Sequence, residues 1–429
     1  MAHASCGPRT ISASEECRMS RLPILAIAVV VCCGCRDAIT PSPSSIVADV
    51  AAGPSGYEVV DLGSFGGIST LGAGLNDRGQ VAGSASVPSG ADHAFVWQDG
   101  VLQDLGFLDG TIAAEAEAIN ARGQIAGSMI ESCGEFACNQ VVRLFLWDSG
   151  SLRQLDPPDG PGHGGTQVVR LTDAGDLVAE VDYSPSATRG VVWRAGVPQD
   201  LGGFSPTQIR TFPNAMNARG QVVGASTVDR PEGGVHLHPF LWENGRLQDL
   251  GVPFERPCRG DPTVNCASAR ALGINARGEV LGVAVNSAGL SRALVWQDAA
   301  VRELDVYPDR TILPIAINDR GQVAGTAVFP AVAFLWDHGV VQELGSLGEG
   351  DTQISALGDA GEVVGWSLTA SGERHAFVWQ DGQMTDLGPG VADGRGSQAQ
   401  VINHRGDVLG FALDSQFHTH AILWRKVGG

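Results

Sequence analysis

The chain has 429 residues, 58 of them Gly, and a formal net charge of −19. This charge argues against nucleic acid as a partner, because binding to phosphate requires clustered Lys and Arg. It argues equally against docking on anionic lipid headgroups. Abundant Gly without a collagen-like period is typical of short strands joined by many tight turns.

The chain begins with a predicted export signal, residues 1–35. Residues 22–35 (LPILAIAVVVCCGC) form an apolar run of about fourteen residues, which is shorter than the roughly twenty that a membrane-spanning helix needs. The run has the length of a signal-peptide apolar region, and Arg18 and Arg21 supply its positive flank. Its end resembles a bacterial lipobox, with Gly34 before Cys35, so Cys35 is the predicted site of lipidation. The alternative is ordinary cleavage and a freely secreted product.

Residues 36–56 are rich in Pro, Ser and Ala and are interpreted as a flexible linker. From residue 57 to residue 427 one unit recurs eight times. A first segment is exemplified by INARGQIAG at Ile119 and INDRGQVAG at Ile317, and a second by HAFVWQDG at His93. Eight Trp residues fill one slot of the second segment, from Trp97 to Trp424, spaced by about 47 residues on average. This period lies within the range of propeller blades.

Each repeat contains two predicted hairpins, hence four strands, which we call a, b, c and d in chain order. The a–b hairpin turns through N-x-R-G, where Asn suits the first turn position and Gly tolerates a positive φ. The c–d hairpin turns after the Trp through sequences such as Gln-Asp-Gly, and the d strand ends in Asp-Leu-Gly. The c strands are continuous apolar runs, which is typical of strands buried on both faces.

The two ends of the repeat region complement each other. Residues 57–63 (YEVVDLG) form a d strand with no a, b or c strand before it, and the last repeat lacks a d strand. The first strand is therefore expected to complete the last blade, which would leave no exposed edge. We predict an all-β fold, a β-propeller of eight four-stranded blades closed by the N-terminal strand.

The H-A-F-x-W, I-N-x-R-G-x-V-x-G and D-L-G segments resemble the bacterial extracellular HAF repeat family. The resemblance covers nearly everything after Tyr57. Repeats three and seven depart from it, with Ala174 and Ala360 at the Arg position. The resemblance implies an exported protein and carries no established activity.

Four Cys remain after Cys35, and they fall in two close pairs, Cys133 with Cys138 and Cys258 with Cys266. Because exported proteins meet an oxidising environment, we predict two loop-closing disulfides. Zinc is the alternative, although the pairs belong to different repeats. Both pairs lie in long b–c or d–a connections, whose variable lengths suggest a binding face. Neutral variation of exposed loops is the alternative.

Candidates for chemistry are sparse. Glu115 and Glu117 on one face of one a strand, with Arg270 on another a strand, are candidates for the wall of a channel. The carboxyl pair suits acid–base work, and a merely solvated wall is the alternative. His residues at the starts of c strands are interpreted as buried or rim residues with backbone partners rather than as metal ligands. Arg residues in the N-x-R-G turns are interpreted as surface residues that bond neighbouring backbone or Asp rather than as an anion site. No metal site and no cofactor are predicted.

Two hypotheses for function follow. The first is a non-catalytic binding scaffold that is exported, anchored to the membrane only through its lipid, monomeric, and recognises an extracellular protein or glycan through the long-loop face. The second is an extracellular carbohydrate-active enzyme, a hydrolase or lyase, with its site at the channel mouth. Carboxylates converging on one place would favour the enzyme, whereas loops without such a cluster would favour the scaffold.

The lipidation site is directly testable. Labelled palmitate fed to cells that express the protein is expected to enter the wild type and not the Cys35→Ser variant, read by gel fluorography. Cys33→Ser is the matched control and should keep the label. Equal labelling of wild type and Cys35→Ser would show that another residue or another export route is used.

Overall fold

The computed structural model describes residues 50–52, 56–131, 141–163, 165–184, 187–230, 234–254, 267–298 and 300–428. These residues belong to the second of two compact units, residues 39–429, and the first unit is residues 1–38. Every regular element in the described part is a β-strand. No helix that could cross a membrane occurs among the residues described. Cys35 and the four loop Cys lie outside them.

The strands follow the predicted order a, b, c, d. The a strands are β3 (Thr70–Leu75), β7 (Thr111–Ile119), β12 (Gln167–Leu171), β16 (Thr211–Met216), β20 (Ala269–Ile274), β24 (Thr311–Ile317), β28 (Thr352–Leu357) and β32 (Gly396–Ile402). The b strands are β4 (Val81–Ser86), β8 (Ile125–Glu131), β13 (Leu177–Ser184), β17 (Val222–Asp229), β21 (Val280–Val285), β25 (Val323–Val328), β29 (Val363–Leu368) and β33 (Val408–Leu413).

The c and d strands also follow the predicted order. The c strands are β5 (Asp92–Gln98), β9 (Val141–Asp148), β14 (Ala187–Arg194), β18 (Val235–Glu243), β22 (Ser291–Gln297), β26 (Val332–Asp337), β30 (Arg374–Gln380) and β34 (Thr419–Lys426). The d strands are β6 (Val101–Asp104), β10 (Ser151–Leu155), β15 (Val197–Asp200), β19 (Arg246–Asp249), β23 (Ala300–Glu303), β27 (Val340–Glu343) and β31 (Gln383–Asp386). Two short strands, β1 (Val50–Ala52) and β11 (Gly162–His163), fall outside this scheme.

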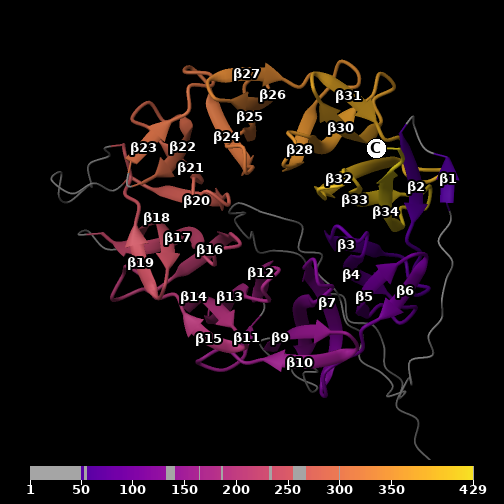
Figure 1. The fold of residues 1–429 in the computed structure, drawn as a ribbon, viewed down its shortest axis with the longest axis horizontal. Coiled ribbons are helices and arrows are strands. Elements are labelled where there is room, and N and C mark those ends of the chain that lie inside the picture. Colours follow the sequence, from indigo (N-terminus) through magenta and orange to yellow (C-terminus); the bar gives the residue numbers. More distant parts are fainter. Residues whose placement is uncertain are drawn as a thin grey trace, which may run out of the picture. The chain divides into compact units, whose positions relative to one another are not determined.

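Antiparallel pairing in the order a-b-c-d builds the sheets. Five sheets have four strands, and the sheet of β7 to β10 gains β11 on β9. The remaining sheet has nine strands. A single parallel pair, Arg374 with Gly396, joins β28–β31 to β32–β34, and the N-terminal strands β1 and β2 add to β34. The sheets follow one another in chain order (Figure 1).

The first long strand, β2 (Tyr57–Asp61), pairs with the last one, β34. Tyr57 lies opposite Lys426 and Asp61 lies opposite Ile422, and Figure 1 shows the two strands side by side. On the other edge of β2 lies β1, whose three residues fall inside the predicted linker 36–56. The next strand, β3, contacts β33 and β34. The N-terminal segment therefore occupies the d position beside the last c strand.

The core lies between neighbouring sheets. The c strands are buried over their apolar stretch, as predicted, with Trp97 and Trp424 at most 1% exposed. One cluster joins Trp97 of β5 to Leu409 and Leu423 of the last sheet, and another joins Val96 of β5 to Phe145 of β9. Each large buried side chain stabilises the fold by about 2–3 kcal/mol relative to its exposed state. Apolar side chains packed between neighbouring sheets therefore help to hold the structure together.

A buried Asn holds each complete N-x-R-G turn and links it to the next one. Asn275 Oδ1 accepts the amides of Arg277 and Glu279, each at 3.0 Å. Its Nδ2 donates to Glu279 Oε2 at 2.6 Å and to the carbonyl of Asn318 in the following turn at 3.0 Å. The same inter-turn bond is donated by Asn76, Asn120, Asn217, Asn318 and Asn403, the last to the carbonyl of Asn76. The Asn of the motif thus forms hydrogen bonds with backbone groups of its own hairpin and of the neighbouring hairpin.

The His and Asp of the H-A-F and D-L-G segments form a second recurring link. His93 Nδ1 lies 2.7 Å from Asp104 Oδ2, while Asp104 Oδ1 accepts the amide of Gly106 at 2.8 Å. The pairs His238–Asp249, His375–Asp386 and His420–Asp61 repeat this contact, and the last of them joins β34 to β2. The c-strand His residues therefore have carboxylate partners, in place of the backbone partners predicted from the sequence.

The Asn link predicts a difference between two turns of similar geometry. Asn275→Ala should lower the free energy of unfolding by about 2–3 kcal/mol, because it removes four bonds and leaves the buried carbonyl of Asn318 without its donor. Chemical denaturation followed by Trp fluorescence measures this loss. Asn286→Ala is the matched control: Asn286 Oδ1 also accepts two amides, from Ala288 and Leu290, but its side chain reaches no other sheet. Equal losses would contradict the inter-sheet role.

Candidate functional site

A cavity of about 460 Å³ lies at the N-x-R-G ends of the a strands. We call it the turn pocket. All eight a–b hairpins contribute to its lining, as does the end of several a strands. The lining includes Asn76, Asp77, Asn120, Ala121, Arg170, Asp173, Asn217, Ala218, Ala276, Asp319, Asp359, Asn403 and His404. Its size falls in the usual range of small-molecule sites.

Charged side chains in the turn pocket come mostly from the second position of the turns. There Asp173 Oδ1 accepts the amide of Ala121 at 2.8 Å, and Asp319 Oδ1 accepts the amide of Ala276 at 2.7 Å. One oxygen of each carboxylate thus caps the turn before it in the chain. Sequence reasoning did not single out these residues, because the position alternates between Asp, Ala and His along the repeats. In the described residues no group of His, Cys, Asp and Glu could hold a metal ion.

His404 occupies the same position in the last turn and lies between two carboxylates. Its Nδ1 is 2.9 Å from Asp77 Oδ2 of the first repeat, and its Nε2 is 2.7 Å from Asp359 Oδ2 of the seventh. Partial burial lowers the pKa of His404, but the charges of Asp77 and Asp359 and the bonds to them outweigh it, so the pKa is raised above 6.5. The two carboxylates therefore favour the cationic form of His404.

Every a strand carries a β-bulge at one position, where a residue has no partner on the b strand. The bulged residues are Ala73, Glu117, Val169, Asn214, Leu272, Ile315, Ser355 and Gln400. A bulge redirects its side chain and is frequent next to active sites. Among these eight residues only Glu117 is a carboxylic acid. The bulge thus aims one predicted candidate in a direction that regular alternation along the strand would not give.

The bulge brings the Glu117 carboxyl into contact with the next sheet. Its Oε1 accepts the hydroxyl of Ser128 on β8, and its Oε2 accepts the amide of Val168 on β12, both at 2.5 Å. Burial, supported by the charge of Glu115 and opposed by these two hydrogen bonds, raises the pKa of Glu117 to about 8. Glu117 is therefore protonated at neutral pH.

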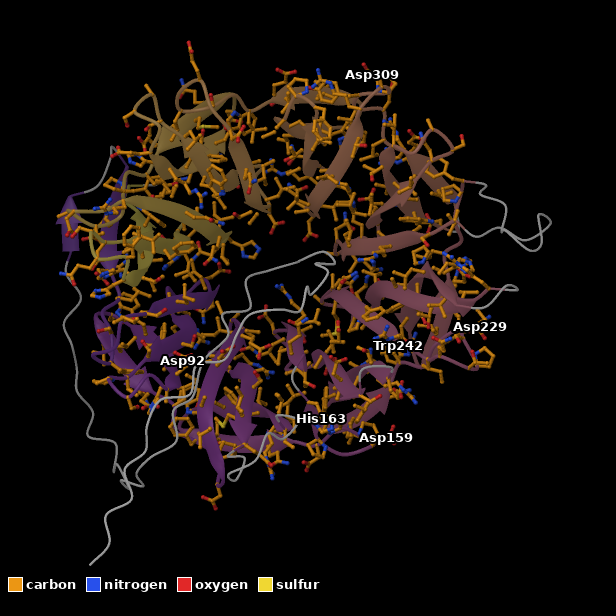
Figure 2. All side chains as sticks on the ribbon, turned by 180° about the vertical axis from the view of Figure 1, so that it is seen from behind. Asp92, Asp159, His163, Asp229, Trp242 and Asp309 are labelled. Carbon is orange, nitrogen blue, oxygen red and sulfur yellow. The ribbon has the colours of Figure 1, made fainter. Side chains whose placement is uncertain are left out.

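The other two predicted channel residues have different surroundings. Glu115 is exposed on β7, and its pKa is raised by partial burial and by the charge of Asp92. Asp92 is the first residue of β5 and is labelled in Figure 2. Arg270 is exposed on β20, in another sheet, and no hydrogen bond or ion pair joins it to Glu115 or Glu117. The structure therefore couples Glu115 and Glu117 electrostatically and leaves Arg270 apart.

Glu180 is a further perturbed acid that sequence reasoning missed. It lies on β13 opposite Gln167, the residue before Val168. Burial first, and the charge of Asp182 second, raise the pKa of Glu180 to about 7 against the opposing charge of Arg210. A carboxyl is unusual at this place, since the matching b-strand residues Ser84 and Ser128 are small. This difference between the repeats could have identified Glu180 from the sequence.

The Arg residues of the turns bind neighbouring turns or their own. Arg320 Nη1 donates to the carbonyl of Ala360 at 2.9 Å, whereas Arg277 pairs with Glu279 at 2.5 Å. The Arg277 guanidinium also lies against Gly321 of the next turn, where an added Cβ would approach it to 2.5 Å and where φ is +80°. Gly is thus favoured there by its positive φ, whereas the flexible end of the Arg277 side chain could move away from an added Cβ. These contacts match the interpretation of the Arg residues as structural.

Comparison with known proteins places the fold only. No family model and no curated protein matches the sequence. The β-propeller domain of the Trilobed protease from Pyrococcus furiosus, with an open velcro topology, is 13% identical; the match covers 80% of this chain and 98% of that one, with a TM-score of 0.43. A prolyl endopeptidase is 11% identical over 79% of this chain and 49% of that chain, with a TM-score of 0.49. TolB from Acinetobacter baumannii is 10% identical over 78% and 76%, with a TM-score of 0.35.

These comparisons correct the hypothesis of a non-catalytic scaffold. The chain spans about half the length of the prolyl endopeptidase, and several of the similar solved structures are peptidases, including a puromycin-hydrolysing one. The similar propeller domains come from peptidases, which contradicts the prediction that the chain is a non-catalytic binding scaffold and more likely not an enzyme. The likeness itself extends to the all-β, propeller-like fold.

The raised pKa of Glu117 predicts a pH-dependent stability. Between pH 4.5 and about 8 the unfolded chain ionises Glu117 while the folded chain keeps it protonated, so this residue lowers the free energy of unfolding as the pH rises. Glu117→Gln removes that loss. The variant should unfold at a higher denaturant concentration than the wild type at pH 9 and at nearly the same one at pH 4. The exposed Glu373→Gln, which also removes one negative charge, is the control. A parallel pH profile for wild type and Glu117→Gln would contradict the shift.

Proposed function

We propose that the eight a-b-c-d units form one closed propeller of eight blades, with β2 as the last strand of the last blade. Three observations support it. The strand β2 pairs with β34, Asn403 donates to the carbonyl of Asn76, and one cavity is lined by turns of all eight repeats. The first and last repeats are thus joined by the same links that join consecutive repeats.

We propose that the protein is a hydrolase that uses Glu117 as its general acid and Glu115 as its partner base. The proposal rests on the Glu117 carboxyl, which accepts hydrogen bonds from Ser128 and Val168 and whose pKa burial raises to about 8, together with the exposed carboxyl of Glu115 on the same strand. Two carboxyls whose environments differ in this way are a recurrent acid–base pair. The bulge holds Glu117 in place through Ser128 and Val168, as a proton donor requires.

The chemistry favours glycosidic bonds as the substrate class. Hydrolysis of an acetal requires a proton for the departing oxygen and a base for the attacking water, and two carboxyls suffice for both. Glu117 would give its proton to the departing oxygen. Glu115 would take a proton from the water, after which exchange with solvent restores both residues. A peptide bond more often requires an activated nucleophile or a metal ion, and no group of the described residues could hold a metal ion.

The place of action follows from the predicted signal. We propose that the chain is exported, that Cys35 anchors it by lipid, and that its substrate is an extracellular glycan. The two predicted disulfides, Cys133–Cys138 and Cys258–Cys266, would then stabilise loops outside the cell. The resemblance to HAF repeats supports the same location.

Activity measurements test the hydrolase proposal. Purified protein is incubated with a panel of bacterial and plant polysaccharides, and the release of reducing ends is followed. Glu117→Gln should lower kcat by about 10²- to 10⁴-fold, the usual contribution of a general acid, and the wild-type rate should fall as the pH rises above about 8.

The control variant changes a bulged residue of another a strand. Asn214 is the bulged residue of β16, and its Nδ2 donates to the carbonyl of Ala271 in the next sheet at 2.7 Å. Asn214→Ala therefore loses a comparable inter-sheet bond without losing an acid, and it should retain most of the activity. Full activity in Glu117→Gln would refute the proposed role, as would the absence of hydrolysis across the panel.

A further inference from the structure

His404 differs from every other residue at its place in the repeat. The second position of the eight N-x-R-G-type turns holds Asp77, Ala121, Asp173, Ala218, Ala276, Asp319, Asp359 and His404. His404 is the only one that can carry a positive charge. It belongs to the last repeat, and its two carboxylate neighbours belong to the first and the seventh. It therefore lies where the two ends of the repeat array meet.

A backbone hydrogen bond fixes the position of the Asp77 carboxylate independently of the imidazole ring of His404. Asp77 Oδ1 accepts the amide of His404 at 3.0 Å, the same cap that Asp173 and Asp319 provide to Ala121 and Ala276. Its second oxygen, Oδ2, is then left to face His404 Nδ1. Asp359 Oδ1 in turn faces the amide of Asp319 at 3.5 Å, which leaves Asp359 Oδ2 to His404 Nε2.

Both ring nitrogens of His404 thus face an anionic oxygen. The imidazolium has an N–H on each nitrogen and can donate to both carboxylates. Neutral imidazole has only one N–H, so its other nitrogen presents a lone pair to a carboxylate and that contact becomes repulsive. Protonation of one side chain therefore makes or breaks the link between the turns of the first and seventh repeats.

The other charged groups near this link are already engaged. Arg405 in the same turn pairs with Asp407 at 2.5 Å, and Arg78 in the first turn donates to the carbonyl of Arg122. In the seventh turn Glu362 accepts the amide of Ala360. No second cation in the described turns faces Asp77 and Asp359, so the imidazolium is the group that holds them.

We propose that His404 is a pH-dependent clasp at the rim of the turn pocket. As the imidazolium it joins the first, seventh and eighth turns and neutralises part of the acidic lining. Above its pKa the clasp opens, so the rim loosens and the pocket becomes more negative. Because the three side chains are 70%, 44% and 43% exposed, the clasp acts on the local rim and leaves the global fold intact. The inference is independent of the proposed hydrolase.

NMR titration of the imidazole tests the clasp, with the His404 signals assigned by comparison with His404→Gln. In the wild type the pKa of His404 should lie above 6.5, and in Asp77→Asn/Asp359→Asn it should be lower than in the wild type, because both anionic partners are gone. Asn at both positions keeps the oxygen that accepts a backbone amide, so the turns should still form.

Hydrogen exchange of the residue 404 amide supplies the second readout. After correction for the intrinsic pH dependence of exchange, its protection in the wild type should fall several-fold across the pKa of His404. In His404→Lys, which stays cationic, the protection should not change over the same range. A pKa at or below 6.5, or protection that is independent of pH in the wild type, would overturn the proposal. An unchanged pKa in the double Asn variant would do so as well.

Discussion

The side-chain amide of the turn Asn is the interaction on which the rest of the structure depends. An isolated four-stranded sheet of this size has two apolar faces and no means of fixing its distance from the next sheet. The Asn donates one bond inside its own hairpin and one into the following hairpin, as Asn217 does to Gln221 and Asn275. Because the amide is buried, loss of either partner would leave an unpaired polar group in a low-dielectric place. The spacing of the sheets and the shape of each turn are therefore set together, and the turn pocket is a product of that spacing.

The same constraint explains why the two departing repeats are tolerated. Thr172 replaces Asn in the third repeat, and its Oγ1 accepts the amide of Asp176, which keeps the hairpin closed without reaching another sheet. Gly358 replaces Asn in the seventh, where Glu362 accepts the amide of Ala360 instead. In both repeats the carbonyl still accepts the Asn of the preceding turn. Each of these two turns thus loses the hydrogen bond that its side chain would donate to the following turn, but it keeps the bond from the preceding turn.

Much of this architecture could be read from the sequence because each repeat specifies its own turns. The Asn, Gly, His and Asp positions mark the hairpins, and the unmatched strand at residues 57–63 marks its partner in the last sheet. The candidate site could be read less well. Glu115 and Glu117 were found from their types, but the pKa of Glu117 depends on a bulge and on the amide of Val168, which is about fifty residues away along the chain. The turn pocket was missed because its lining comes from eight separate repeats, which the sequence does not show converging on one cavity.

The pairing of β2 with β34 sets an order of events for the chain. These strands are separated by more than three hundred residues, so β2 leaves the ribosome first and must wait for the last strand to appear. Until then its apolar residues Val59 and Val60 and an open hydrogen-bonding edge are exposed to other chains. A growing chain in this state can associate edge to edge with other chains until β34 has been made. The position of one five-residue strand thus links the timing of synthesis to the risk of aggregation.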